Sequence, residues 1–459
     1  MNLQHLQGKA AYVVGLGRSG MATIRALKKA LVKIYAWDDG SSSRANIQDS
    51  DINLIPPEEL DYNLIDFLVI SPGIPNLYPF PHPAASKARK EGIPLICDIE
   101  LFAQGINNMP IDKQPKVIGI TGTNGKSTVT AMTTHVLNTL GYKAYAGGNI
   151  GNAVFNLPDI LSNQFYVLEL SSYQLELIES PFLSAALLIN ISEDHLERHG
   201  GMKGYIKAKK HIFRLTKSGG KNIIGIDDTY TAQIHENYKN MLLGFSTTKQ
   251  TEDMVHVSNG YLINPRTQES INLYKTSILK GTHNHQNIAA CYTLLSKLIE
   301  LTMEDFGNAL QNFKGLAHRQ EFISSKNGIT FINDSKATSL EAAAKSLENY
   351  KNIYWIMGGQ SKTNWDKVSI VAPFYDNIRR IYSFGNSGEL YAHLFSKDIL
   401  SKNYGTMQKA VDAAYVDASL DTDESVILLS PACSSFDQFK DFEDRGNQFK
   451  AFVKTMVGE

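Results

Sequence analysis

Short apolar runs alternate with longer amphipathic runs along most of this chain. The short runs are rich in β-branched residues and predict strands that are buried on both faces. The longer runs place apolar residues on one side of a helix and predict helices that cover those strands. Regular alternation of the two kinds of element favours parallel sheets, so we expect an α/β fold.

The expected elements fall into three groups. In chain order, the expected strands are Ala10–Val14, Lys33–Trp37, Phe67–Ile70, Lys116–Ile120, Phe165–Leu170, Ala185–Ile189, Thr330–Ile332, Ile353–Met357, Arg380–Phe384 and Val426–Leu429. The clearest expected helices are Met21–Ala30, Thr128–Leu140 and Asn284–Glu300. A polar stretch that contains proline, Gln104–Gln114, reads as a linker. Residues 247–276 show no clear pattern.

A chain of 459 residues is long enough for about three domains of roughly 150 residues each. We place the boundaries at residues 1–108, 109–313 and 314–459. The formal net charge of −1 excludes a general attraction to nucleic acid or to anionic membranes. Three widely spaced cysteines and the lack of a long apolar run favour a protein of the reducing cytoplasm.

A glycine-rich loop, Gly119–Ser127, lies between an expected strand and an expected helix. Glycines let backbone N–H groups converge on phosphate oxygens, and the helix N-terminus adds a positive dipole. Lys126 is placed to reach the outer phosphates of a nucleotide, and the Ser127 hydroxyl to bind Mg²⁺. The first glycine lies one residue too early for a strict Walker A motif. The alternative is a tight turn with no ligand.

A second glycine pattern follows the first expected strand. Gly15, Gly17 and Gly20, with Asp38 after the next strand, match a dinucleotide fingerprint that suggests binding of NAD. The pattern is weak evidence, because helices that pack closely on strands also need small residues. The turn Ser71-Pro72-Gly73 and the residue Asn149 also lie at strand ends, where they would complete a nucleotide crevice.

The middle of the chain carries an acid, a histidine pair and a lysine run. Glu169 ends a strand, where a carboxylate points towards the ligand crevice and can bind Mg²⁺, although a helix N-cap or a surface acid is an alternative. His195 and His199 have the spacing of a zinc pair but lack the HExxH glutamate, so a single metal or phosphate contact from His195 fits better, with a solvated polar loop as the alternative. The run Lys207, Lys209 and Lys210 is by itself typical of a solvated helix face.

Together these motifs resemble the Mur ligase family. The resemblance spans the chain and rests on Ser71–Pro75, Thr121–Ser127, Gly148–Gly151, Glu169–Glu176, Glu193–His195, Gly281–Asn284, His318-Arg319, Asn333–Thr338, Ser430–Cys433, Asp437–Phe442 and Arg445-Gly446. The TGTNGK loop marks the family as a whole. The NDSKAT and SPAC…DQF segments are typical of its members that add D-glutamate.

The resemblance implies three α/β domains with the active site in the clefts between them. The N-terminal domain would be Rossmann-like and bind UDP-N-acetylmuramoyl-L-alanine. A central P-loop-type domain would bind ATP, and a Rossmann-like C-terminal domain would bind D-glutamate. ATP would phosphorylate the acceptor carboxylate, and the amine of D-glutamate would attack the acyl phosphate. We expect a cytoplasmic monomer with no nucleic-acid or membrane partner.

The resemblance assigns roles to individual residues. Lys126, His195 and Lys209 would be catalytic, and two Mg²⁺ ions would be bound by Ser127, Glu169, His195 and a carbamylated Lys209. The nucleotide would contact Gly122, Thr123, Asn124, Gly125, Lys126, Ser127, Thr128, Asn284, Asn287, Arg319 and Asp334. The substrates would contact Ser19, Ser71, Asn149, Lys336, Thr338, Lys362, Ser435 and Phe442.

Two segments depart from the family pattern. Asp38-Asp39-Gly40 lacks the Thr-Arg pair that some members use to bind the uridine diphosphate, and Gly358–Lys362 alters a GGxGK-like turn. Three other functions compete with ligation of D-glutamate. Folylpolyglutamate synthase shares this type of loop but takes a pterin acceptor. A dehydrogenase leaves Lys126 and Lys209 unexplained, and a non-catalytic nucleotide-binding module does not need the set Lys126, Glu169 and His195.

Overall fold

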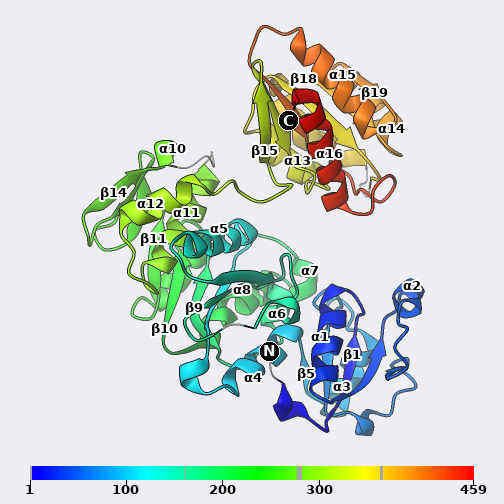
Figure 1. The fold of residues 1–459 in the computed structure, drawn as a ribbon, viewed down its shortest axis with the longest axis vertical. Helices are drawn as coiled ribbons and strands as arrows, with labels where there is room; N and C mark the ends of the chain where they lie inside the picture. The colour runs from blue at the N-terminus through cyan, green and yellow to red at the C-terminus, as the bar shows by residue number, and fades with distance from the viewer. Residues whose placement is uncertain (1–2, 160, 277–281, 362–364, 459) are drawn as a thin grey trace. The chain divides into compact units, whose positions relative to one another are not determined.

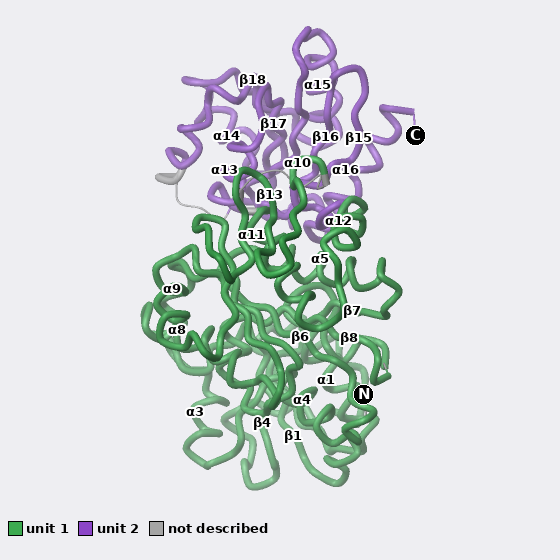
Figure 2. Tube along the Cα trace, turned by 90° about the vertical axis from the view of Figure 1, so that its left-hand side faces the viewer, with its two compact units in different colours: residues 1–278, 282–313 green, residues 279–281, 314–459 purple. Residues whose placement is uncertain are grey.

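The computed structural model describes residues 3–159, 161–276, 282–361 and 365–458 (Figure 1). These residues form two compact units, with the change from one to the other at Lys314 (Figure 2). The first unit holds two sheets and the second unit holds one. None of the helices in the described ranges is both long and apolar enough to cross a membrane.

The first sheet has five parallel strands in the order β3-β2-β1-β4-β5. Its strands are β1 (Ala10–Val14), β2 (Lys33–Trp37), β3 (Ile52–Leu54), β4 (Phe67–Ile70) and β5 (Leu95–Ile96). Its helices are α1 (Arg18–Lys29), α2 (Ser41–Ala45), α3 (Pro83–Lys90) and α4 (Asp98–Asn107). Helix α1 and the strands share a core that includes Val13, Ile24 and Leu27.

The second sheet has nine strands in the order β14-β13-β12-β11-β10-β9-β6-β8-β7. Its strands are β6 (Lys116–Thr121), β7 (Ala144–Gly148), β8 (Phe165–Glu169), β9 (Leu183–Leu188), β10 (Thr216–Gly225), β11 (Leu243–Ser246), β12 (Val255–Ser258), β13 (Tyr261–Asn264) and β14 (Glu269–Asn272). Its helices are α5 (Lys126–Thr139), α6 (Ser172–Leu175), α7 (Leu196–His199), α8 (Met202–Lys210), α9 (Thr229–Asn237), α10 (Leu273–Thr276), α11 (Thr282–Leu295) and α12 (Met303–Gln311). Strands β6 to β12 pair in parallel, whereas β12, β13 and β14 form an antiparallel meander.

The third sheet lies in the second unit and has the order β15-β16-β20-β17-β18-β19. Its strands are β15 (Glu321–Lys326), β16 (Ile329–Asn333), β17 (Ile353–Gly358), β18 (Ile378–Phe384), β19 (Ser401–Asn403) and β20 (Ser425–Leu429). Its helices are α13 (Leu340–Leu347), α14 (Gly388–Phe395), α15 (Met407–Ser419) and α16 (Phe442–Val457). Only the β15–β16 pair is antiparallel among its described pairings.

The α/β prediction with mostly parallel sheets is confirmed, and each expected strand is present within two residues of its predicted bounds. The linker expected at Gln104–Gln114 is wrong in its first part, because Gln104–Asn107 belong to helix α4. That helix buries Phe102 against Tyr166 and Phe182, with ring centroids 5.2 and 6.4 Å apart. Its apolar face therefore belongs to a core that the first two sheets share.

Candidate active site

The phosphate loop joins β6 to α5 at the carboxyl edge of the second sheet. Gly125 adopts φ +82, and a Cβ there would lie 2.2 Å from Oδ1 of Asn287 on α11. The position therefore needs glycine, both for its left-handed backbone and for the close approach of α11. Asn287 also donates a hydrogen bond to Asn284 Oδ1 (3.1 Å), so both predicted nucleotide contacts on α11 lie beside each other near the loop.

Hydrogen bonds from the backbone and from side chains fix the conformation of the phosphate loop. The Thr123 and Asn124 N–H groups donate to the carbonyl and the side-chain oxygen of Asn190, each at 2.9 Å. Lys126 Nζ donates to the carbonyls of Gly122 (2.9 Å) and Thr123 (2.8 Å). The ammonium thus lies at the loop beside the start of α5, where a helix dipole and a cation together favour an anion.

Glu169 ends β8 and is 2% exposed. Its Oε1 accepts a hydrogen bond from Asn149 Nδ2 at 2.7 Å, whereas its Oε2 is buried and has no hydrogen-bond partner. A buried carboxylate oxygen without a donor is costly unless a cation binds it. The alternative role as a helix cap does not apply, because Ser171 caps the following helix α6.

A divalent cation bound to Glu169 would need most of its other ligands from groups other than His, Cys, Asp or Glu side chains. No group of three or more His, Cys, Asp or Glu side chains gathers as a metal centre in the described ranges. Mg²⁺ suits such a sparse site, because it usually binds one or two carboxylates, several waters and substrate phosphates. The Ser127 hydroxyl, in the first turn of α5, is the further protein oxygen that the sequence pointed to.

Lys209 is almost fully buried, so a solvated position is wrong for this member of the lysine run, whereas Lys207 is exposed. Its Nζ donates to the Gly122 carbonyl at 2.6 Å and lies 4.8 Å from the centre of the Tyr205 ring. Burial lowers the pKa of Lys209 well below its usual value, and the nearby Lys126 lowers it further. The structure therefore places a readily deprotonated amine against the phosphate loop.

His195 is the N-cap residue that precedes the short helix α7, and its φ of 51 is uncommon for a residue that is not glycine. Its Nε2 lies 3.5 Å from Asp194 Oδ2, and burial is the main cause of its lowered pKa. His199 does not pair with it as a zinc ligand. Both ring nitrogens of His199 are engaged, one with Glu176 Oε1 at 2.6 Å and the other with Ser172 Oγ at 2.9 Å.

The first glycine pattern shapes a turn in the first sheet. A Cβ at Gly20 would lie 1.8 Å from the Gly15 carbonyl oxygen, so this glycine allows α1 to approach β1. Asp38 accepts hydrogen bonds from the Leu16 N–H (2.7 Å) and the Gly40 N–H (2.8 Å). The carboxylate that would bind a ribose in a dinucleotide site is thus bonded to the protein's own backbone.

The predicted substrate contacts of this sheet form hydrogen bonds to residues of neighbouring segments. Ser71 Oγ donates to the Gly15 carbonyl at 3.1 Å, and Ser19 Oγ donates to Asp98 Oδ2. Asp98 is buried at the start of α4, and its burial raises its pKa. Ser19 therefore lies in the first turn of α1, and Ser71 lies in the turn that follows β4.

In the second unit, Asp334 follows β16 and is almost fully buried. Its Oδ2 accepts hydrogen bonds from Ser346 Oγ (2.6 Å) and Ser430 Oγ (2.9 Å), while burial raises its pKa to about 6. Arg319 is exposed nearby and acts on the pKa of Asp334 in the opposite direction. These two predicted nucleotide contacts are neighbours at one end of the third sheet.

The predicted D-glutamate contacts lie around a buried arginine. Lys336 Nζ lies 5.9 Å from the centre of the Phe442 ring, Ser435 is buried, and Thr338 is half-buried. Arg445 is fully buried and donates to Ser335 O (2.8 Å), Cys433 O (3.1 Å) and Gly358 O (3.5 Å). It joins the end of β17 to the segments that follow β16 and β20. Lys362 lies outside the described residues.

Sequence reasoning missed several residues that shape these sites. The Tyr205 hydroxyl lies 3.0 Å from Thr123 Oγ1, and Lys209 Nζ lies over the Tyr205 ring. The sequence could have indicated the contact between Tyr205 and Lys209, because residues four apart on one helix share a face. The role of Asn190 could not be read in this way, because it depends on the approach of a loop from β9 to the phosphate loop.

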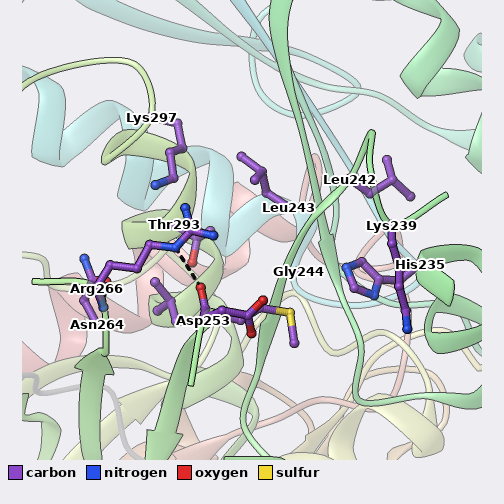
Figure 3. Close-up of a pocket in the computed structure, with 12 residues that line it drawn as sticks. His235, Lys239, Leu242, Leu243, Gly244, Asp253, Asn264, Arg266, Thr293 and Lys297 are labelled. Carbon is purple, nitrogen blue, oxygen red and sulfur yellow. Dashed lines mark hydrogen bonds between the residues drawn. The ribbon is translucent and has the colours of Figure 1, made fainter. Parts of the chain in front are cut away.

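A cavity of about 330 Å³ lies away from the phosphate loop, between the β11–β13 strands and the helices α9 and α11 (Figure 3). Its lining includes His235, Lys239, Arg266 and Lys297, and Arg266 Nε donates to the Asp253 carbonyl at 3.0 Å. It shares no residue with the predicted nucleotide or substrate contacts. We therefore place the candidate active site at the phosphate loop, where titratable groups with shifted pKa values lie close together.

Comparison with known proteins gives the family of this chain. Residues 120–295 match the Mur ligase middle domain. UDP-N-acetylmuramoylalanine--D-glutamate ligase of Caulobacter vibrioides is 39% identical over 458 residues, covering 98% of this chain and 97% of that protein. The enzyme of the same name from Paramagnetospirillum magneticum is 39% identical over 453 residues, with the same coverage.

Solved structures agree at the level of the fold. UDP-N-acetylmuramate-alanine ligase of Thermotoga maritima has a TM-score of 0.58 at 17% identity, covering 98% of this chain and 100% of that one. MurF ligase of the same organism, solved in complex with ADP, has a TM-score of 0.55 at 15% identity, covering 99% and 97%. With a phosphate loop, an unpartnered buried carboxylate and full-length relatives at this identity, the chain belongs to the Mur ligase family.

Proposed function

We propose that this protein ligates D-glutamate to UDP-N-acetylmuramoyl-L-alanine with hydrolysis of ATP to ADP and phosphate, in the synthesis of peptidoglycan precursors. The observation that carries the proposal is the arrangement of Lys126, Glu169 and Lys209 around the phosphate loop. The names of the full-length relatives support the choice of substrates. We further propose three domains, at residues 1–108, 109–313 and 314–459, in a cytoplasmic monomer.

Activation of the acceptor carboxylate is the first step. The carboxylate oxygen attacks the γ-phosphorus of ATP, the bond to the β,γ-bridging oxygen breaks, and ADP leaves. The Lys126 ammonium lies at the loop, where it would balance the charge that develops on the phosphoryl oxygens. Gly122–Thr128 would hold the phosphates through backbone N–H groups and hydroxyls, while Asn284, Asn287, Arg319 and Asp334 would contact the nucleotide.

Glu169, Ser127 and His195 would hold Mg²⁺, which supplies charge neutralisation for the phosphates when it is bound. The unpartnered Oε2 of Glu169 supports this assignment. Lys209 fits a carbamate, because its burial favours the unprotonated amine that reacts with CO₂. The carbamate would turn a cation into an oxygen ligand and so complete a site that contains few carboxylates.

Amide formation is the second step. The amine of D-glutamate attacks the acyl carbon, the bond to phosphate breaks, and the amine loses a proton. Lys336, Thr338, Lys362, Ser435 and Phe442 would bind D-glutamate. Ser19, Ser71 and Asn149 would bind the acceptor. Arg445 supports the first group, because it holds the segments that carry Lys336 and Ser435.

Phosphate release tests the proposal directly. The purified protein is mixed with ATP, Mg²⁺ and UDP-N-acetylmuramoyl-L-alanine, and amino acids are added one at a time. We expect D-glutamate to release phosphate far faster than L-glutamate, L-lysine or meso-diaminopimelate. Preference for a diamino acid would reject the proposed substrate while leaving a ligase of this family, and no phosphate release with any amino acid would reject ligation itself.

A further inference from the structure

One arginine connects helix α7, which follows His195, to the turn that contains Ser71, and these two segments carry different predicted roles. Arg198, on helix α7, donates from Nη1 to the Gly73 carbonyl (3.1 Å) and from Nη2 to the Ile74 carbonyl (3.2 Å). A longer contact joins Nη2 to the Pro72 carbonyl (3.5 Å). These carbonyls belong to the turn that follows β4 and contains Ser71. Helix α7 is the same short helix that His195 precedes as its N-cap residue.

An aromatic ring supports the arginine from the other side. The Arg198 guanidinium lies 4.5 Å from the centre of the Tyr173 ring, which is close enough for a cation–π interaction. Tyr173 also stacks on His199, at 5.4 Å and an interplanar angle of 18°. The centre of its ring is 5.3 Å from that of His195. The planar guanidinium is therefore held between a ring and three carbonyl oxygens.

The support of Tyr173 leads back to the same turn. His199 is fixed by Glu176 and Ser172, as described above, and the second oxygen of Glu176 accepts a hydrogen bond from Asn76 Nδ2 at 3.2 Å. Asn76 in turn accepts a hydrogen bond from Arg89 Nη2 at 2.9 Å. The network thus begins and ends in residues 72–76 and passes beside His195. It fixes this turn and α7 together at two separate points.

We propose that Arg198 is a positioning residue, which fixes the position of the acceptor-binding turn at Ser71 relative to His195. This inference rests on the proposed function, since that function assigns the acceptor to Ser71 and the phosphate chemistry to His195. The acceptor carries both the uridine diphosphate and the carboxylate that is phosphorylated. Arg198 therefore sets the distance at which one bound molecule reaches both sites, although it need not touch the molecule.

Removal of the guanidinium tests the role. In Arg198→Ala we expect the KM for UDP-N-acetylmuramoyl-L-alanine to rise at least about tenfold, because the turn that carries Ser71 loses three hydrogen bonds from a charged group. The KM for ATP and the KM for D-glutamate should stay within about twofold. Calorimetry should show the same loss of acceptor affinity without turnover. Arg198→Lys should recover only part of the acceptor affinity. The compact ammonium of lysine cannot reach three carbonyls at once as the planar, forked guanidinium of arginine does.

Arg25→Ala is the matched control. Arg25 on α1 also joins the two sheets of this unit, through Nη2 to Asn156 Oδ1 at 3.1 Å, but among the described residues it makes no hydrogen bond or ion pair with a predicted site residue. Its loss should leave all three KM values unchanged. A merely structural role for Arg198 would lower the melting temperature or the active fraction and leave the KM for the acceptor unchanged, and that outcome overturns the proposal. An inactive wild-type protein would instead overturn the proposed function.

Discussion

Replacement of Lys209 by alanine and by methionine separates its chemistry from its packing. Alanine removes three buried methylene groups as well as the amine, and at about 0.8 kcal/mol per methylene this change should cost roughly 2 kcal/mol of unfolding free energy. Methionine keeps a stem of similar length, so Lys209→Met should cost less. Both variants lose the amine that bonds to the Gly122 carbonyl at 2.6 Å.

Activity should fall in both variants by at least about 100-fold. Removal of a group that only supports a metal ligand already costs about 10–100-fold, and a carbamate on Lys209 would be a direct ligand. Acetate has two oxygens and can enter the space that alanine leaves. It should therefore restore part of the activity of Lys209→Ala, whereas Lys209→Met, whose stem fills that space, should not respond.

The assay is phosphate release at saturating substrates, with sodium chloride at the same ionic strength as the salt control. Mass spectrometry of the intact wild-type protein in bicarbonate buffer should show an added mass of one CO₂ that is absent from both variants. Full activity of Lys209→Ala without an additive would refute the role of Lys209. Equal stimulation of both variants by acetate would refute the carbamate as its cause.

Three further results are expected. Lys126→Ala should bind the UDP precursor normally and lose about 10²–10³-fold in phosphate release, because its ammonium lies at the phosphate loop; near-normal turnover would contradict that role. Titration calorimetry of the whole protein should show binding of UDP-linked ligands and none of NAD, and tight NAD binding would revive the dehydrogenase interpretation. Because burial raises the folded-state pKa of Asp334 to about 6 from 3.8, its protonated form is favoured by folding. Wild-type stability relative to Asp334→Asn should therefore fall by up to about 3 kcal/mol as the pH rises from 4 through 6, and urea unfolding that gives a difference independent of pH would contradict the burial argument.

Local pattern was enough to predict the parallel strands and the phosphate loop. The strands read as continuous apolar runs, and the loop has glycines at a spacing that few other structures require. Local pattern was insufficient where the decisive partner is distant in sequence. The last turn of α4, Gln104–Asn107, was assigned to a linker because its local sequence is polar, whereas the helix is held in place by Phe102, which packs on the distant Tyr166. Residues 247–276 gave no signal because their short antiparallel strands extend the edge of the second sheet.

Lys209 shows the same limit at the level of one side chain. In the sequence it stands among other lysines and resembles a solvated face, yet its neighbour Lys207 is exposed while Lys209 is buried. The difference arises because α8 turns the Lys209 side chain towards Gly122, which is 87 residues earlier in the chain. Family resemblance assigned the residue a role, and the fold supplies the burial that lowers its pKa.

The bonding of Arg445 has a consequence for how substrate preference can change in this unit. In the described part of the chain its hydrogen bonds go to main-chain carbonyls and to the hydroxyl of Ser335, and none goes to a carboxylate. Main-chain oxygens are present whatever side chain a residue carries. The arginine therefore constrains the path of three loops without constraining most of their side chains. We expect that a library of substitutions at Lys336, Thr338 and Ser435 will keep folded proteins while altering amino-acid preference, whereas the same library with Arg445→Met will not fold.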